Sequence, residues 1–129
     1  AVLNRGSVLQ SKLGPISLGD YSTIGAGSIV VSQGKGANIG SWVGIAGGCE
    51  ISGGLFKIQP PEKPGAPPFV RYTKGPITLG DNTILAYGAI VIDGVTIGKN
   101  CMVGPGCTVI SDLHDDASIS NRPGIVLKR

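Results

Sequence analysis

The sequence predicts an all-β fold, a parallel β-helix built from six-residue repeats with one long loop extruded from its middle. Aliphatic residues recur every six positions in twelve units, each of which begins with Leu, Ile or Val. Glycine follows directly in six of those units, where the chain must turn a tight corner. A Pro-rich stretch divides the units into two blocks. A period of six fits neither an α-helix nor one long alternating strand, so it indicates short strands joined by corners.

Length and composition indicate a single domain over residues 1–129. The net charge of +3 is too mild to favour nucleic acid as a partner. No apolar run approaches the ~18 residues that a membrane span needs. The three cysteines are an odd number without metal-type spacing, and the first residues lack the organisation of a signal peptide. These features together predict a cytoplasmic protein.

Three units make one turn of the predicted coil, so apolar residues of successive turns stack in interior columns about 4.8 Å apart. The three columns are Leu18, Ile39, Leu79 and Ile97; Ile24, Ile45, Leu85 and Val103; and Val30, Ile51, Val91 and Val109. Small residues fill a second inward position, in the columns Ser22, Val43, Thr83, Cys101 and Ser28, Cys49, Ala89, Cys107. The cysteines are therefore predicted to belong to the core and not to a disulfide or a metal site.

The two ends are less regular. Val2 and Val8 keep the period, but Gly14 and Pro15 interrupt it, which predicts an incomplete first coil and about five coils in all. Because an open coil leaves backbone groups unpaired, we expect residues 112–129 to form a cap on the C-terminal end.

The predicted loop covers residues 57–78 and contains six prolines. It carries four basic residues and one acidic residue, so its charge is +3 (4 − 1) and the rest of the chain is neutral. Proline stiffens a loop, and loops of this length in compact domains are often functional. A functional or subunit-contacting loop and a passive insertion both remain open at this point.

The stretch ITLGDNTILAYGAIVIDGVTIGKNCMVGPGCTVISD, followed by NRPGIVLKR, resembles the hexapeptide-repeat acyltransferases, among them sugar O-acetyltransferases and serine or xenobiotic acetyltransferases. The resemblance implies a left-handed coil and a homotrimer. It also implies acetyl-CoA as a substrate, held between neighbouring β-helices, with the loop near the site and no metal. The acceptor would be a hydroxyl or amine of a small molecule such as a sugar. A γ-carbonic anhydrase shares the fold but needs three zinc-binding histidines, and this chain has one.

The family's general base is a histidine near the root of the loop, and the matching position here is Gly54. His114 is the only histidine and becomes the candidate base. Its predicted column with Phe56 and Thr96 places it two coils from the loop root, about 10 Å along the axis. The alternative is an exposed turn histidine without a catalytic role.

The resemblance also implies residues that contact coenzyme A. The candidates in this chain are Tyr87, Pro105, Ser111, Arg122 and Lys128. Family members often place Thr-Lys where this chain has Ile110 and Ser111, so the pattern is thinned. Two functions therefore remain open: an acetyltransferase, and a non-catalytic, degenerate β-helix trimer with a structural or ligand-binding role.

Overall fold

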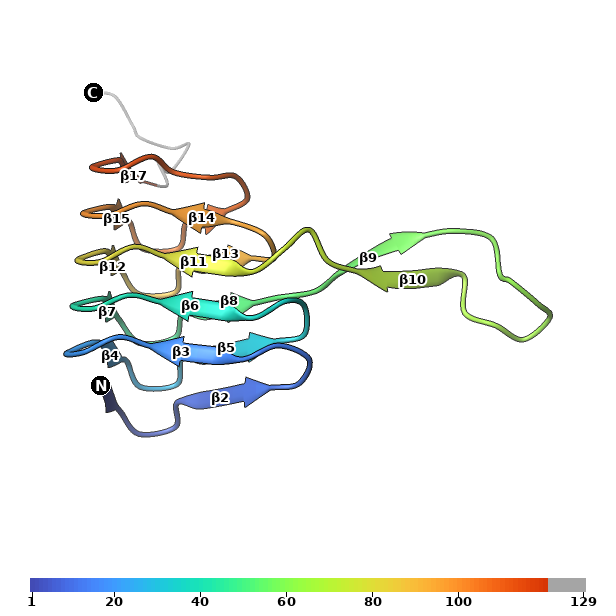
Figure 1. Ribbon diagram of the computed structural model, residues 1–129, viewed down its shortest axis with the longest axis horizontal. Helices are drawn as coiled ribbons and strands as arrows, with labels where there is room; N and C mark the ends of the chain where they lie inside the picture. The colour runs from blue at the N-terminus through green and yellow to red at the C-terminus, as the bar shows by residue number, and fades with distance from the viewer. Residues whose placement is uncertain (121–129) are drawn as a thin grey trace, which may run out of the picture.

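The computed structural model describes residues 1–120 and shows a β-helix of three parallel sheets with an antiparallel hairpin projecting from its side (Figure 1). The coil is left-handed, because the front strands run from right to left while the chain climbs from the N-terminus (Figure 1). Sheet A contains β1 (Val2–Leu3), β4 (Thr23–Ile24), β7 (Gly44–Ile45), β12 (Ile84–Leu85), β15 (Met102–Val103) and β17 (Ser118–Ile119). Sheet B contains β2 (Val8–Ser11), β5 (Ile29–Ser32), β8 (Glu50–Ser52), β13 (Ile90–Ile92) and β16 (Thr108–Val109). Sheet C contains β3 (Ile16–Leu18), β6 (Ala37–Ile39), β11 (Ile77–Leu79) and β14 (Thr96–Ile97).

The chain passes through sheets C, A and B in turn, and we number the coils accordingly. Coil 1 is β3–β5, coil 2 is β6–β8, coil 3 is β11–β13 and coil 4 is β14–β16. A partial coil of β1 and β2 precedes them, and a last coil of Leu113 and β17 follows. The predicted coil architecture is confirmed.

The three predicted apolar columns are confirmed by the strand registers. Every member is buried except Leu18, which is half-buried in the first complete coil. Neighbouring coils thus share one continuous core, as expected for a solenoid whose single repeats cannot bury their own apolar face.

The small-residue columns are also buried, and backbone groups at the corners satisfy their hydroxyls. Ser22 Oγ donates to the Gly40 carbonyl at 2.6 Å and accepts the Val43 N–H at 3.1 Å. Cys49, Cys101 and Cys107 are free and buried, as predicted for core residues.

Glycine after the aliphatic position is required by the distance between coils. A Cβ added to Gly80 would lie 2.5 Å from the backbone carbonyl carbon of Gly98, directly in the next coil. The corner between sheets C and A can therefore stack at coil spacing only if this column lacks side chains.

The first coil is incomplete, as predicted, but its inward residues differ from the expectation. Leu3 pairs with Ile24 and Leu9 with Val30, so these leucines continue the apolar columns. Val2 and Val8 occupy the outward positions, where both are exposed. The offset between these coils is 21 residues, three more than the regular eighteen-residue turn, because the corner between sheets B and C is longer here. The inward positions therefore fall on Leu3 and Leu9, one residue after Val2 and Val8.

The segment from residue 112 to 120 continues the β-helix as the last coil of the described residues. Leu113 bridges to Ile97, and β17 pairs with β15. The offset to the preceding coil is 16 residues, as the pairing of Met102 with Ser118 shows. The Asp112 carboxylate accepts the Thr96 N–H at 2.8 Å. Residues 121–129, the remainder of the predicted cap, lie outside the described residues.

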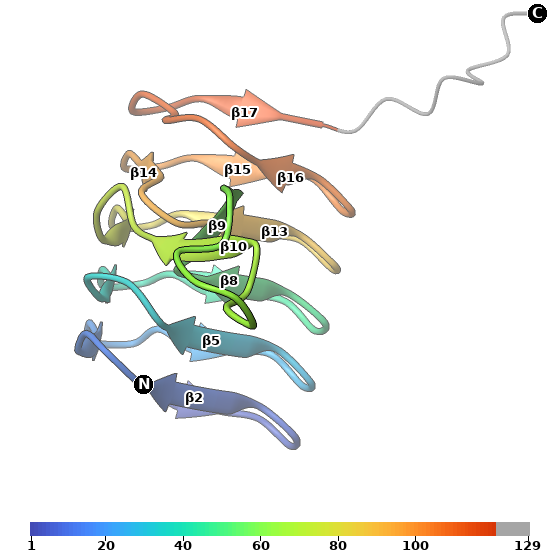
Figure 2. The same ribbon diagram turned by 90° about the vertical axis from the view of Figure 1, so that its right-hand side faces the viewer.

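The extruded segment, which we call the arm, is a β-hairpin of β9 (Leu55–Ile58) and β10 (Phe69–Tyr72). It leaves the helix after β8 and returns before β11, between coils 2 and 3 (Figures 1 and 2). Its first strand begins two residues before the predicted Lys57 boundary, and Ile77 and Thr78 already belong to sheet C.

Candidate functional site

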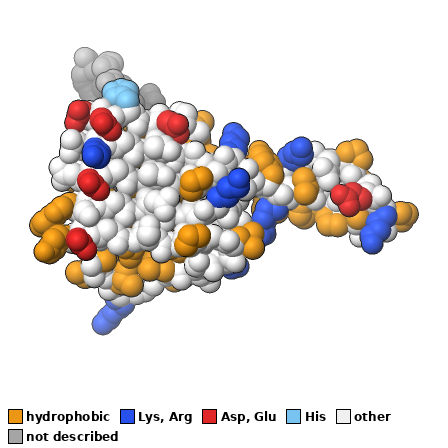
Figure 3. Space-filling model, viewed as in Figure 1, with side chains coloured by type: hydrophobic (Ala, Val, Ile, Leu, Met, Phe, Trp, Pro, Cys, Tyr) orange, Lys and Arg blue, Asp and Glu red, His pale blue; other side chains and the backbone are white. Residues whose placement is uncertain are grey.

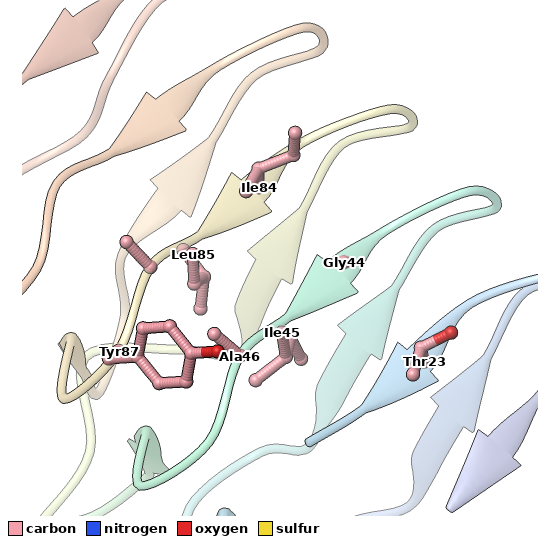
Figure 4. Close-up of a pocket in the computed structure, with 8 residues that line it drawn as sticks. Thr23, Gly44, Ile45, Ala46, Ile84, Leu85 and Tyr87 are labelled. Carbon is pink, nitrogen blue, oxygen red and sulfur yellow. The ribbon is translucent and has the colours of Figure 1, made fainter.

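An open apolar pocket of about 410 Å³ lies on the outer face of sheet A (Figure 4). It crosses coils 1 to 3, and its lining residues are Thr23, Gly44, Ile45, Ala46, Ile84, Leu85, Ala86 and Tyr87. Gly44 contributes no side chain between Thr23 and Ile84, which deepens the pocket along the stacking direction. The surface suits a slender, mainly apolar ligand that runs across several coils.

Tyr87 closes one end of this pocket, at the corner between sheets A and B. Its side chain is 73% exposed. Its ring lies close to Gly47 in the coil below, since a Cβ at Gly47 would be 3.6 Å from two ring carbons. Pro105 occupies the equivalent corner one coil higher, where the Gly106 N–H bonds to the Tyr87 carbonyl at 2.9 Å. The structure thus brings together two residues that the sequence predicted as coenzyme A contacts.

Cys49 lies beneath the pocket with its Sγ 3.0 Å from the Ala86 carbonyl oxygen. Burial raises the pKa of the Cys49 thiol. Because the thiolate is the nucleophilic form, this cysteine is a buried hydrogen-bond donor and not a nucleophile.

The root of the arm is organised by Asp93, a residue that the sequence analysis did not single out. Its carboxylate is 2% exposed and accepts the Gly54 N–H at 2.8 Å and the Lys74 N–H at 2.6 Å. Thr73 Oγ1 donates to the same carboxylate at 2.9 Å. Asp93 therefore binds both strands of the arm where they leave and rejoin the helix. One sequence feature could have identified Asp93: it is followed by a glycine, Gly94, at the first corner between sheets B and C after the insertion.

Gly54 stands where the resemblance places a catalytic histidine. Its φ is +95°, and a Cβ there would lie 3.2 Å from the Gln33 Cβ. A side chain at this position would be strained, because L-residues rarely adopt positive φ. The residue contributes its backbone N–H to Asp93 instead.

His114 does not lie in the predicted column with Phe56 and Thr96. Phe56 pairs with Arg71 on the arm, and Thr96 pairs with Thr78 in sheet C. Because the last coil is two residues shorter than an eighteen-residue turn, His114 stacks instead over Gly98, as the bond from the Gly98 N–H to the Leu113 carbonyl shows. His114 therefore occupies the position that glycine holds in the preceding coils, at the corner between sheets C and A.

A side chain is tolerated at His114 because it occupies the last coil of the described part of the chain. The ring is exposed, and Nδ1 lies 2.8 Å from the Asp115 carbonyl oxygen. The corner between sheets C and A is at the opposite end of the sheet C strands from the arm root. Within one copy, His114 is therefore remote from both the arm root and Tyr87.

Ser111, another predicted contact, follows β16 at the corner between sheets B and C. The register of Val91 with Val109 places it one coil above Asp93. Its side chain is exposed. Arg122 and Lys128 lie outside the described residues. The predicted site residues thus occupy three different corners: Tyr87 with Pro105, Ser111, and His114.

Two further features are absent from residues 1–120. No group of three His, Cys, Asp or Glu side chains is arranged to hold a metal ion in this part of the chain. The same residues form no helix that is long and apolar enough to cross a membrane.

Comparisons with known proteins agree with this architecture. Residues 76–111 match the model of the bacterial transferase hexapeptide (six repeats). A serine acetyltransferase of Synechococcus elongatus is 35% identical over 52 residues, which are 40% of this chain and 21% of that protein. The matched segments span 21% to 28% of the curated relatives' lengths.

Similar folds occur among solved structures. The N-acyltransferase AntD from Bacillus cereus, in complex with dTDP and 3-hydroxybutyryl-CoA, superposes with a TM-score of 0.79 at 19% identity, over 95% of this chain and 66% of AntD. A maltose O-acetyltransferase from Clostridium difficile 630 gives 0.64 at 23% identity, over 91% of this chain and 62% of that protein. At these identities the likeness establishes the fold.

Proposed function

We propose that this chain, whose residues 76–111 match the bacterial transferase hexapeptide (six repeats), is a CoA-dependent acyltransferase. Its reaction would be acetyl transfer to a hydroxyl or amine of a sugar. The acceptor oxygen or nitrogen attacks the thioester carbonyl, the carbon–sulfur bond breaks, coenzyme A leaves as its thiol, and a base removes the acceptor's proton.

The pocket on sheet A is the observation that carries this proposal. An apolar channel across coils 1 to 3 fits the pantetheine arm of acetyl-CoA, with Tyr87 and Pro105 at one end. Backbone amides at the corners would bind its polar groups. The phosphates need cations, and the candidates Arg122 and Lys128 follow the described coil in sequence.

The base is assigned to His114 within this proposal. Because His114 is remote from the arm root of its own chain, it would act at the site of a neighbouring copy in a homotrimer. The proposal also includes a cytoplasmic location, where the three free thiols would stay reduced.

Gly54 favours a second candidate function. In this alternative the chain is a non-catalytic trimer that binds a ligand or has a structural role. The positive φ of Gly54 and its bond to Asp93 give this position a structural purpose where the family has its base.

Calorimetric titration of acetyl-CoA into the full chain separates the two candidates. The enzyme proposal expects saturable binding that Tyr87→Ala weakens at least about tenfold, while Leu13→Ala, an exposed apolar residue outside the pocket, changes nothing. His114→Ala is expected to keep this affinity and to lower transfer to sugar acceptors about 10²-fold or more. No binding at millimolar acetyl-CoA would eliminate the enzyme candidate, and unchanged transfer would remove His114 from the mechanism.

A further inference from the structure

The corner between sheets C and A contains a backbone feature that packing within the chain does not explain. At one turn position of this corner, five residues in successive coils have positive φ: Tyr21, Trp42, Asn82, Asn100 and Asp116. Asn and Asp tolerate this conformation, whereas bulky side chains adopt it at a cost. Coils 1 and 2 thus hold aromatic residues where asparagine would be less strained.

The two aromatic side chains lie outside the core. The Tyr21 and Trp42 rings stack with centroids 4.6 Å apart and an interplanar angle of 22°. The side chains remain 69% and 62% exposed. Strained residues of this kind often serve a function that the strain accompanies. An exposed aromatic pair of this size typically contacts a partner.

Carboxylates flank the pair. The preceding turn position holds Asp20, Ser41 and Asp81 in coils 1 to 3, and Asp81 Oδ1 accepts the Ser41 N–H at 2.9 Å. We call Asp20, Tyr21, Trp42 and Asp81 the aromatic corner. Along all five coils this corner has four aspartates, Asp20, Asp81, Asp115 and Asp116, against one lysine, Lys99. Figure 3 shows acidic and hydrophobic side chains at the edge opposite the arm. Such a surface repels phosphates and attracts cations.

The arm has the complementary surface. Directly paired residues of an antiparallel hairpin share a face, so Phe56, Ile58, Phe69 and Arg71 lie together and form what we call the arm face. Phe56 and Phe69 pack edge to face with centroids 5.5 Å apart, and the Arg71 guanidinium lies 5.2 Å above the Phe56 ring centre. Ile58 is 90% exposed.

A two-stranded hairpin that projects alone is marginally stable in water unless its face is packed. The arm projects in this way, away from the three sheets (Figures 1 and 2). Residues 55–72 of the arm carry three basic residues and one acidic residue, a charge of +2 (3 − 1), opposite in sign to the charge of the acidic corner. Arg can stack on Trp or Tyr while pairing with a carboxylate.

We propose that the arm face of one copy of this chain docks on the aromatic corner of a second copy. In a cyclic assembly whose symmetry axis is parallel to the β-helix axis, a given residue lies at the same height along that axis in every copy. The arm leaves between coils 2 and 3, and the aromatic pair lies in coils 1 and 2, so the two surfaces differ by about one coil spacing of 4.8 Å. The tip of the arm descends toward the level of β5 in Figure 2. The inference needs the second copy of the proposed trimer but not its catalytic activity.

Trp42 is the only tryptophan of the chain and provides a direct probe. As the concentration of the full chain rises through the association range, measured by sedimentation, Trp42 emission is expected to shift to the blue. Association without any shift would overturn the docking model while leaving a trimer, and the acetyl-CoA titration, untouched. A chain that stays monomeric at all concentrations would overturn it as well.

Substitutions test the same contact from both sides. Tyr21→Asn with Trp42→Asn should keep the far-UV circular dichroism spectrum, since asparagine suits this turn, and raise the dissociation constant at least about tenfold. Ile58→Asp should do the same from the arm. Leu13→Asn removes an equally exposed apolar side chain elsewhere and should have no effect. Arg71→Asp combined with Asp20→Arg should recover part of the affinity that each loses alone. An unchanged dissociation constant in the Tyr21 and Trp42 variant would refute the interface.

Discussion

The Asp93 carboxylate accepts the Lys74 N–H at 2.6 Å and the Gly54 N–H at 2.8 Å, so one buried side chain binds both ends of an insertion that separates coils 2 and 3. The insertion would otherwise leave these two amides unpaired at the edge of a solenoid. A single carboxylate thus allows the β-helix to continue without a break in its columns.

Replacing Asp93 with Asn tests this role. Asparagine has the same size, but its NH₂ group would face the donors that Asp93 now accepts, the N–H groups of Gly54 and Lys74 and the Thr73 hydroxyl. We therefore expect the free energy of unfolding to fall by about 2–3 kcal/mol. Hydrogen exchange of the arm amides should accelerate more than that of sheet A. Asp112→Asn is the matched control, because Asp112 also accepts a backbone N–H but is exposed. Equal losses in both variants would contradict a special role of Asp93.

Two glycines allow the two reasons for glycine at corners to be measured separately. Gly80 does not have a positive φ, but a Cβ there would be 2.5 Å from the Gly98 carbonyl carbon. Gly27 has a φ of +71° and open space around it. We expect Gly80→Ala to cost about 3 kcal/mol, since backbone must move, and Gly27→Ala to cost about 1 kcal/mol. Urea denaturation measures both, and a larger cost for Gly27→Ala would mean that coil spacing adapts to the added side chain.

The repeat was readable from the sequence because each column position has one physical requirement. Aliphatic residues such as Leu79 and Ile97 fill the interior, and small residues such as Ser22 fit beside them. This pattern alone predicts the columns and the burial of the cysteines. The hand of the coil came only from the family resemblance, because spacing is the same in either hand.

Register at irregular corners could not be read in the same way. The sequence does not indicate that the last coil is shorter by two residues, so the predicted column of His114 was wrong. An irregular corner also explains why the period pointed to Val2 and Val8 as the inward residues of the first coil, where the structure has Leu3 and Leu9. Asp93 was missed because its partners are backbone amides of residues 39 and 19 positions away, a relationship that exists only once the arm has folded. Tyr87 and Pro105 came together because both lie at the same corner of regular coils.

Cys49 makes stability depend on pH in the alkaline range. Burial raises the pKa of its thiol above the ordinary value of 9.0, so above about pH 9 the unfolded chain loses this proton while the folded chain retains it. The unfolded state then binds fewer protons, and stability falls as the pH rises toward the folded-state pKa. Below pH 9 both states hold the proton and the contribution is complete. Cys49→Ala has a precedent in Ala89, the next residue of the same column, and should flatten part of the decline in the free energy of unfolding between about pH 8.5 and 10.5, as measured by urea denaturation at each pH. Cys107→Ala removes a thiol from the same column and serves as the comparison. Parallel curves for wild type and Cys49→Ala would show that other groups cause the decline.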